Sequence, residues 1–218
     1  MILIENIAKK FGDNTILENI NLKLEEGKIY GFVGKNGSGK TILFKMIAGF
    51  ISPTTGKIKI NNMELGIDRD FPESCGVIIE SPGFINTLSG YKNLKMLADI
   101  KGIISDEKIK EYMNLFGLNY NDKKKVKNYS LGMKQKLGLI QALMEDPKIL
   151  ILDEPMNALD EESVIKVRNI LKQLKQDKII LLSSHNKEDI EFLCDDIYEV
   201  NNGTIKTLED NTDKSSVS

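Results

Sequence analysis

A glycine-rich segment, residues 34–41, has the composition and spacing of a phosphate-binding loop. It reads GKNGSGKT and fits the pattern GxxxxGK[ST]. Glycines let the backbone bend tightly and bring its N–H groups to phosphate oxygens. The lysine would then reach the β- and γ-phosphates of a nucleotide, and the threonine hydroxyl would hold Mg²⁺. The alternative is a flexible glycine turn. The expected phosphate-binding residues are Gly34, Lys35, Asn36, Gly37, Ser38, Gly39, Lys40, Thr41 and Ile42.

Two carboxylates follow a later apolar segment. Asp153 and Glu154 come directly after Ile149–Leu152, which is expected to be a buried strand. Asp153 is placed to hold Mg²⁺, directly or through water. Glu154 is placed to orient or deprotonate an attacking water. An acidic turn that caps the next segment is the alternative, but the phosphate-loop pattern elsewhere in the chain favours a catalytic pair.

The elements around these residues alternate between strands and helices. The apolar run Ile29–Val33 precedes the glycine loop, and apolar residues at helical spacing follow it until Gly49. Residues 87–147 have a helical pattern, which we interpret as an inserted helical lobe. Strands alternating with helices predict a parallel α/β sheet. Further expected elements are strands at Met1–Ala8, Ile20–Leu24, Val77–Ile79 and Ile179–Leu182, a hairpin at residues 57–62, and a helix at Glu161–Lys175.

Composition places the chain among reduced, cytosolic, soluble proteins. It has 218 residues, of which 41% are hydrophobic and 28% charged, and a net charge of -2, so no general attraction to nucleic acid is expected. Cys75 and Cys194 lie far apart and suggest neither a disulfide framework nor a zinc site. No apolar run approaches the roughly 20 residues of a spanning helix, and the N-terminus lacks the order of a signal peptide. Any membrane part should therefore belong to another chain.

Several motifs in one order resemble the ABC ATPase family over essentially the whole chain. After the phosphate loop come Ser130-Leu131-Gly132-Met133, then Asp153-Glu154-Pro155, then Ser183-Ser184-His185. The resemblance implies a P-loop NTPase fold of the RecA-like type: a parallel-sheet core, a small antiparallel β lobe and an inserted α-helical lobe. It implies a single domain over residues 1–218. The core and β lobe would occupy about 1–83 and 148–210, the helical lobe 84–147 and a flexible tail 211–218.

The resemblance also assigns roles to further residues. Ser130 and Gly132 stand where the family carries its LSGGQ signature, although Leu131 and Met133 depart from it. A serine and a glycine N–H at a helix start still form an anion site. In the family this segment closes on the γ-phosphate of ATP bound to the opposite subunit. An ordinary serine-capped helix is the alternative.

Three more positions match family motifs. His185 resembles the switch histidine that contacts the γ-phosphate, and Asp160 matches the loop that communicates across a dimer. Phe11 lies where an aromatic ring stacks on adenine, with a core residue as the alternative. Together with Glu154 and Lys40, His185 completes the expected catalytic set.

Glu80 is the most informative departure from the family pattern. ABC ATPases usually carry a glutamine there, which contacts Mg²⁺ and water and senses the transmembrane partner. A glutamate still offers oxygens to Mg²⁺ but adds a negative charge near Asp153 and Glu154. Glutamate at this position, together with the SLGM signature, resembles the branch associated with export of bacitracin and lantibiotic peptides. The expected metal ligands are Thr41, Glu80 and Asp153.

The resemblance predicts a Mg²⁺-dependent ATPase that powers a separate membrane permease. Two copies would dimerise head to tail around two ATP molecules, on the cytoplasmic face of the membrane, with no nucleic-acid partner. The main alternative is a soluble ABC ATPase that serves DNA repair, translation or cluster assembly. Such proteins tend to have long coiled coils, tandem cassettes or basic surfaces, which this sequence lacks. A phosphate-loop kinase would leave the signature and His185 unexplained.

Overall fold

The computed structural model describes residues 1–80 and 83–208. The tail expected at residues 211–218 lies outside the described residues. A six-stranded sheet in the order β10-β9-β3-β8-β7-β6 forms the centre of the molecule. Its strands β9, β3, β8, β7 and β6 run parallel, and β10 pairs antiparallel with β9. The strands span Lys28–Val33 (β3), Cys75–Ile78 (β6), Ile149–Asp153 (β7), Ile179–Ser183 (β8), Asp196–Asn201 (β9) and Thr204–Leu208 (β10).

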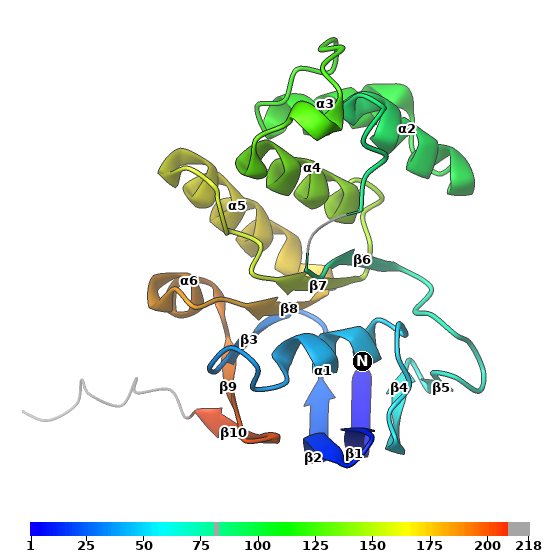
Figure 1. Cartoon of the computed structure of the whole chain (residues 1–218), viewed down its shortest axis with the longest axis vertical. Coiled ribbons are helices and arrows are strands. Elements are labelled where there is room, and N and C mark those ends of the chain that lie inside the picture. Colours follow the sequence, from blue (N-terminus) through cyan, green and yellow to red (C-terminus); the bar gives the residue numbers. More distant parts are fainter. Residues whose placement is uncertain (81–82, 209–218) are drawn as a thin grey trace, which may run out of the picture.

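A second, antiparallel sheet of four strands has the order β2-β1-β4-β5. Its strands are Ile2–Phe11 (β1), Asn14–Leu24 (β2), Thr55–Ile60 (β4) and Met63–Glu64 (β5). Helix α1 (Lys40–Ile47) lies between this sheet and the central sheet (Figure 1). The small antiparallel β lobe is therefore present, and its β4–β5 hairpin is where the sequence predicted one.

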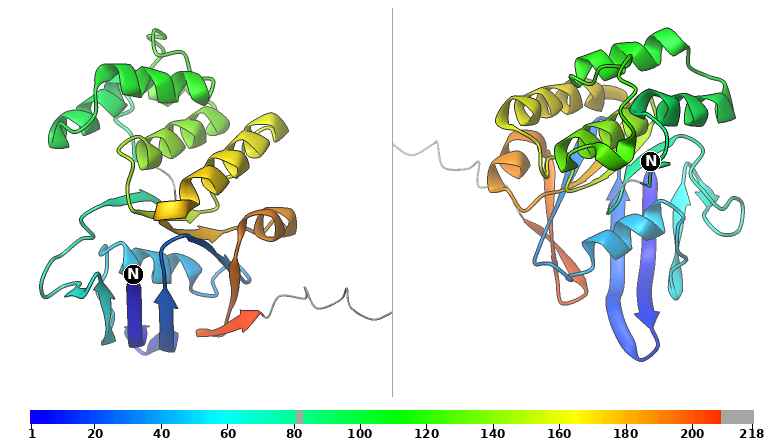
Figure 2. Two further views of the ribbon diagram at one scale, coloured as in Figure 1. Left: turned by 180° about the vertical axis from the view of Figure 1, so that it is seen from behind. Right: turned by 45° about the horizontal axis from the view of Figure 1, so that its top comes forward.

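The helical lobe lies on the opposite side of the central sheet. It contains α2 (Gly90–Lys101), α3 (Asp106–Leu115) and α4 (Leu131–Leu143), and a short 3-10 turn, η1 (Val126–Asn128), precedes α4. Helices α5 (Glu161–Leu174) and α6 (Lys187–Leu193) cover the rest of that side, and the 3-10 turn η2 (Lys175–Asp177) leads from α5 into β8. Both views of Figure 2 show α2, α3 and α4 grouped at one end of the molecule, away from the β lobe.

Alternation along the central strands explains this layering. In β7, Leu150 and Leu152 are buried in the core shared with the helical lobe, whereas Ile149 and Ile151 are buried in the core shared with α1 and the β lobe. Successive side chains of a strand point to opposite faces. A parallel sheet covered on both faces therefore needs continuous apolar strands, as the sequence has here.

The expected α/β fold with its β lobe and helical lobe is confirmed, and the main differences lie at the C-terminal end. The sequence indicated neither α6 nor the β9–β10 hairpin, and it placed the start of β2 at Ile20 rather than Asn14. The outer half of β2 is largely exposed, so it has no apolar alternation to detect. No helix in the described part of the chain is long and apolar enough to span a membrane.

Candidate functional site

The phosphate loop connects the end of β3 to the start of α1, and its backbone requires glycine. Gly34 has φ 146° and Gly39 has φ 110°, values that disfavour a side chain. A Cβ on Gly34 would overlap the carbonyl oxygen of Val200, and one on Gly39 would lie 2.7 Å from Leu17 Cδ2. Crowding and conformation therefore both select glycine, as the loop pattern requires.

Two polar groups of the loop are arranged to receive phosphate. Lys40 is 8% exposed, and its ammonium donates to the carbonyl oxygens of Gly34 (2.7 Å) and Lys35 (3.2 Å). The Ser38 hydroxyl is buried and makes no hydrogen bond to any described residue. A buried hydroxyl without a partner is unfavourable. Phosphate oxygens would give it and Lys40 acceptors, so the residues present fit a nucleotide phosphate chain.

Asp153, at the carboxyl end of β7, stands between two hydroxyl groups, that of Thr41 in α1 and that of Ser183 at the carboxyl end of β8. Thr41 Oγ1 donates to Asp153 Oδ2 at 2.6 Å, and Ser183 Oγ donates to Asp153 Oδ1 at 2.5 Å. Because β8 lies between β3 and β7, the ends of all three strands meet at one edge of the sheet. Threonine and carboxylate oxygens are ligands that suit Mg²⁺. Thr41 and Asp153 therefore fit a magnesium site.

Glu154 and His185 contact each other beside this edge. Glu154 has φ 51°, and its N–H donates to Ser183 Oγ (3.0 Å) and to the Ser183 carbonyl (3.2 Å). Its Oε2 lies 2.8 Å from His185 Nδ1 and accepts the His185 backbone N–H at 3.3 Å. The left-handed backbone of a non-glycine residue is unusual and is often found at functional sites. This geometry directs the carboxylate toward the imidazole.

A cavity of about 440 Å³ brings the phosphate loop and the acidic pair together. Phe11 and His185 are not among its lining residues. Phe11 is 50% exposed, and the Lys9 ammonium lies 5.0 Å from its ring centroid. The cavity is lined by Ile16, Asn36, Gly37, Ser38, Gly39, Lys40, Thr41, Ile42, Asp153 and Glu154.

The signature segment forms a separate site at the start of α4. Ser130 caps this helix, with its Oγ accepting the Met133 N–H at 3.2 Å. A Cβ on Gly132 would lie 2.7 Å from the Ala158 carbonyl oxygen, so α4 contacts the loop after β7 closely. Ser130, Gly132 and Asp160 line their own cavity of about 690 Å³ and do not line the phosphate-loop cavity.

Asp160 caps α5 beside this second cavity. Its carboxylate accepts the Ser163 N–H at 2.9 Å and pairs with Lys136 Nζ at 3.2 Å. Hydrogen bonds from the Ser163 backbone and hydroxyl, and then from Lys136, hold the pKa of Asp160 well below its usual range. Asp160 and the signature serine Ser130 therefore line the same cavity.

Comparison with known proteins identifies the family. The family model described as ABC transporter matches residues 17–157, a range that contains both the phosphate loop and the acidic pair. The chain belongs to the ABC transporter family.

Curated relatives of this ABC protein cover most of its length. The uncharacterized ABC transporter ATP-binding protein YybJ of Bacillus subtilis is 45% identical over 210 residues, covering 96% of each chain. The lantibiotic transport ATP-binding protein SrtF of Streptococcus pyogenes is 39% identical and covers 94% of this chain and 89% of its own. The bacitracin transport ATP-binding protein BcrA of Enterococcus faecalis is 38% identical, over 91% of this chain and 66% of its own. This ABC protein is accordingly an ATP-binding subunit with ATPase activity.

Solved structures have the same fold. An ATP-binding subunit of an ABC transporter superposes with a TM-score of 0.85 at 25% identity, covering 95% of this chain and 90% of that one. A dimeric post-hydrolysis state of an ATP-binding cassette, bound to ADP and Pi, superposes with a TM-score of 0.84 at 23% identity, covering 96% and 100%. These likenesses confirm the expected fold class.

Glu80 of this ABC protein is paired with a lysine. Its Oε1 lies 2.6 Å from Lys45 Nζ, and its backbone has φ 58°. Lys45 is one helical turn beyond Thr41, so the pair lies along the same face of α1 as the predicted magnesium ligand. Its lysine partner offsets the extra negative charge that a glutamate introduces here. The role of Glu80 as a metal ligand stays a prediction.

Three further residues belong to the site, although no role was predicted for them from the sequence. Ser183 bridges Asp153 and Glu154, and only its place at the end of a buried strand next to His185 could have indicated this. Ile16 of β2 lines the cavity although it is far from the loop in the sequence. Gln135 Nε2 donates to the carbonyl oxygens of Pro155 (2.9 Å) and Glu154 (3.3 Å), and thereby joins α4 to the acidic loop.

Proposed function

We propose that this ABC protein is the motor of a membrane exporter of antimicrobial peptides. The exporter would give the cell immunity or resistance to these peptides. The contact between Thr41 and Asp153 at 2.6 Å carries the ATPase part of the proposal, because it joins the phosphate loop to the acidic strand end. Relatives named for bacitracin and lantibiotic transport, 38% and 39% identical to this chain, support the peptide cargo.

Hydrolysis would proceed on ATP held in the phosphate-loop cavity. Glu154 accepts a proton from a water whose oxygen bonds to the γ-phosphorus, and the bond from that phosphorus to the bridging oxygen breaks to release ADP and phosphate. His185 holds the Glu154 carboxylate through the 2.8 Å contact. Lys40 turns from the loop carbonyls to the β- and γ-phosphates.

Magnesium would be held at the edge of the central sheet. Thr41 and Asp153 would supply oxygen ligands to the ion, and the Glu80 carboxylate would offer a further oxygen ligand on the same side of α1. The ion offsets the negative charge of the phosphate groups when it is bound.

The site would be completed by a second copy of the chain. Ser130, Gly132 and Asp160 line a cavity that is separate from the phosphate-loop cavity. If these residues act on ATP, the nucleotide must therefore be one that the partner copy holds. A head-to-tail dimer with two ATP molecules in its interface satisfies this requirement.

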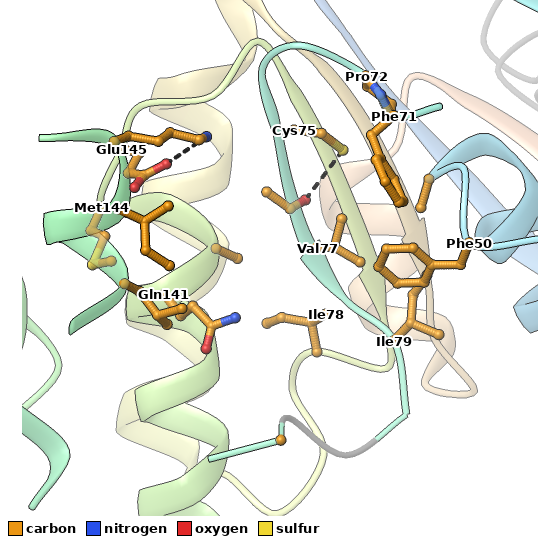
Figure 3. A pocket seen from close by; sticks show the side chains of 17 residues that line it. Phe50, Phe71, Pro72, Cys75, Val77, Ile78, Ile79, Gln141, Met144 and Glu145 are labelled. Carbon is orange, nitrogen blue, oxygen red and sulfur yellow. Dashed lines mark hydrogen bonds and ion pairs between the residues drawn. The ribbon is translucent and has the colours of Figure 1, made fainter. Parts of the chain in front are cut away.

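The permease would dock in a hollow between the central sheet and the helical lobe. This cavity, of about 470 Å³, has Phe50, Phe71 and Ile79 on one side and Gln141 and Met144 on the other (Figure 3). Phe50 and Phe71 are 53% and 57% exposed. Large exposed apolar side chains around a hollow are typical of protein–protein contact sites. We place the protein at the cytoplasmic face of the membrane through this contact.

The catalytic assignment is tested by Mg²⁺-dependent ATP hydrolysis of the purified chain over a range of protein concentrations. We expect Glu154→Gln to lower kcat on the order of 100-fold or more, because a general base typically contributes that much. The rate per wild-type chain should rise with concentration if two copies share each site. A normal rate in the Glu154→Gln variant would refute the role given to Glu154.

The peptide cargo is tested in the cell that makes the protein. Deletion of the gene should lower the minimal inhibitory concentrations of bacitracin and of a lantibiotic, and the wild-type gene should restore them. Glu154→Gln is the matched control, since it leaves the fold and the permease in place and should not restore resistance. Unchanged sensitivity to both peptides in the deletion strain would contradict peptide export.

A further inference from the structure

A buried ion pair lies beneath the loop that carries His185. Asp189 in α6 is 2% exposed, and its Oδ1 accepts Arg168 Nε from α5 at 2.8 Å and Arg168 Nη2 at 2.5 Å. The Arg168 side chain is itself only 15% exposed. The functions assigned so far use neither residue.

The second oxygen of Asp189 holds the residue that precedes His185. Ser184 Oγ donates to Asp189 Oδ2 at 2.9 Å and accepts the Asn186 N–H at 3.1 Å. Ser184 is 6% exposed. A single hydroxyl therefore fixes the residues on both sides of His185, and the carboxylate that fixes the hydroxyl is anchored to a different helix.

His185 depends on this loop for its position. Its side chain is 72% exposed, so packing restrains the imidazole little. Both its ring nitrogen and its backbone N–H contact one oxygen, Glu154 Oε2. The lengths of these two contacts therefore depend on where the loop places the His185 backbone. A displacement of about 1 Å in such a catalytic contact can cost on the order of 100-fold in rate.

Because the charges of Arg168 and Asp189 are buried, the ion pair is better explained by positioning of the His185 loop than by a contribution to stability. Replacing a buried ion pair by apolar residues of similar size is often neutral or stabilising, because desolvation of the charges is costly. An apolar pair, however, would give the Ser184 hydroxyl no acceptor. The charged pair is thus the arrangement that both bridges α5 to α6 and directs the loop.

We propose that Arg168, Asp189 and Ser184 are positioning residues that hold His185 against Glu154. The network sets the backbone of residues 184–186, and through it the distance between the imidazole and the carboxylate. This inference rests on the proposed function for its effect on rate, but the placement of His185 can be measured separately.

His185 is the only histidine in the sequence, so a protein without a tag has one imidazole to observe by NMR. We expect the ring ¹⁵N resonances of His185, recorded at one pH near neutrality, to move toward those of a free imidazole in Ser184→Ala and in Asp189→Asn. Glu188→Gln is the matched control. Glu188 is 79% exposed and lies 3.7 Å from the same Arg168, without contact to Ser184, so its spectrum should match the wild type. Unchanged His185 resonances in folded Ser184→Ala would overturn the proposal.

Steady-state kinetics give a second readout that a merely structural role would not move. Ser184→Ala should lower kcat on the order of tenfold or more while KM for ATP stays within about twofold. In a His185→Ala background the same substitution should cause no further loss, since it acts through His185. If Ser184→Ala lowers kcat by the same factor in the His185→Ala variant as in the wild type, Ser184 does not act through His185. Resonances that move with no change in kcat would uphold the placement and refute the catalytic role of His185 instead.

Discussion

Hydroxyl groups organise the charged residues of this ABC protein. Ser183, with no exposed surface, contacts Asp153 and Glu154 at once, and Thr41 and Ser184 each hold a carboxylate. The hydroxyls of Ser183 and Thr41 donate to Asp153, that of Ser184 donates to Asp189, and the Ser183 hydroxyl also accepts the backbone N–H of Glu154. These hydroxyl groups therefore fix the positions of the acidic residues around the phosphate loop and the His185 loop.

Ser183→Ala tests the role of the Ser183 hydroxyl. The change removes the hydroxyl that donates to Asp153 Oδ1 at 2.5 Å and that accepts the Glu154 N–H at 3.0 Å. We expect a loss of about 1–3 kcal/mol in the free energy of unfolding, measured in urea. Mg²⁺-ATPase activity should fall as well, because the Asp153 carboxylate and the Glu154 backbone N–H each lose a hydrogen-bond partner.

Thr54→Ala is the control for Ser183→Ala. The Thr54 hydroxyl also accepts a backbone N–H, from Lys10 at 3.0 Å, but in the β lobe. The ATPase activity of the Thr54→Ala variant should equal that of the wild type. Equal activity in the Ser183→Ala variant would contradict the role given to this serine.

Among the elements, the contact of β6 with α4 joins the central sheet to the helical lobe. Gly76 in β6 lies against the backbone of Ala142, where an added Cβ would overlap the carbonyl oxygen. The Gln135 contacts at the other end of α4 join the same helix to the acidic loop. Helix α4, which begins with the signature residues, is therefore held to the core at both ends.

Gly76→Ala should force β6 and α4 apart. We expect it to cost about 1–3 kcal/mol or more in the free energy of unfolding, because the obstructing atom is backbone and cannot rotate away. Thermal unfolding of the purified variant provides the measurement. Gly83→Ala is the control, since a Cβ there meets no described atom within 4 Å. Equal unfolding temperatures for the two variants would show that this contact is not tight.

For the whole molecule, two separate cavities contain the residues to which we assign nucleotide binding, so the proposed function requires a second copy of the chain. The phosphate-loop cavity contains the groups that would bind the phosphates, and the signature cavity contains Ser130 and Asp160. Neither cavity alone has both sets. In the proposed dimer, each nucleotide would therefore contact residues of both copies.

Glu154→Gln should accumulate as a dimer when ATP and Mg²⁺ are present. Loss of the base leaves ATP intact in the interface, so light scattering after size exclusion should give twice the mass of one chain. Without nucleotide the same variant should be a monomer. Adding Ser130→Arg should leave ATP binding intact and block the dimer, because a bulky cation replaces the signature serine. A monomer at saturating ATP in the Glu154→Gln variant would contradict the shared site.

Local patterns in the sequence were sufficient for the phosphate loop, most of the strands and the helical lobe. The run Ile149–Leu152 is β7, and the glycine-rich segment does lie between β3 and α1. These features depend on neighbouring residues: backbone freedom at glycine, continuous apolar residues in a buried strand, and helical spacing of apolar residues. The C-terminal hairpin was missed because β9 is mostly half-buried, without alternation between buried and exposed positions.

The family resemblance predicted one metal site for Thr41 and Asp153, but only the tertiary structure gave the contacts between residues and the further partners. The order β3-β8-β7 brings Thr41, Asp153 and Ser183 together, although pairing between parallel strands leaves no local mark in a sequence. The same holds for the pairing of Glu80 with Lys45, and for the burial of Arg168 and Asp189 beneath the His185 loop. A sequence motif identifies a residue type at a spacing along the chain, whereas distance and burial depend on how the whole chain packs.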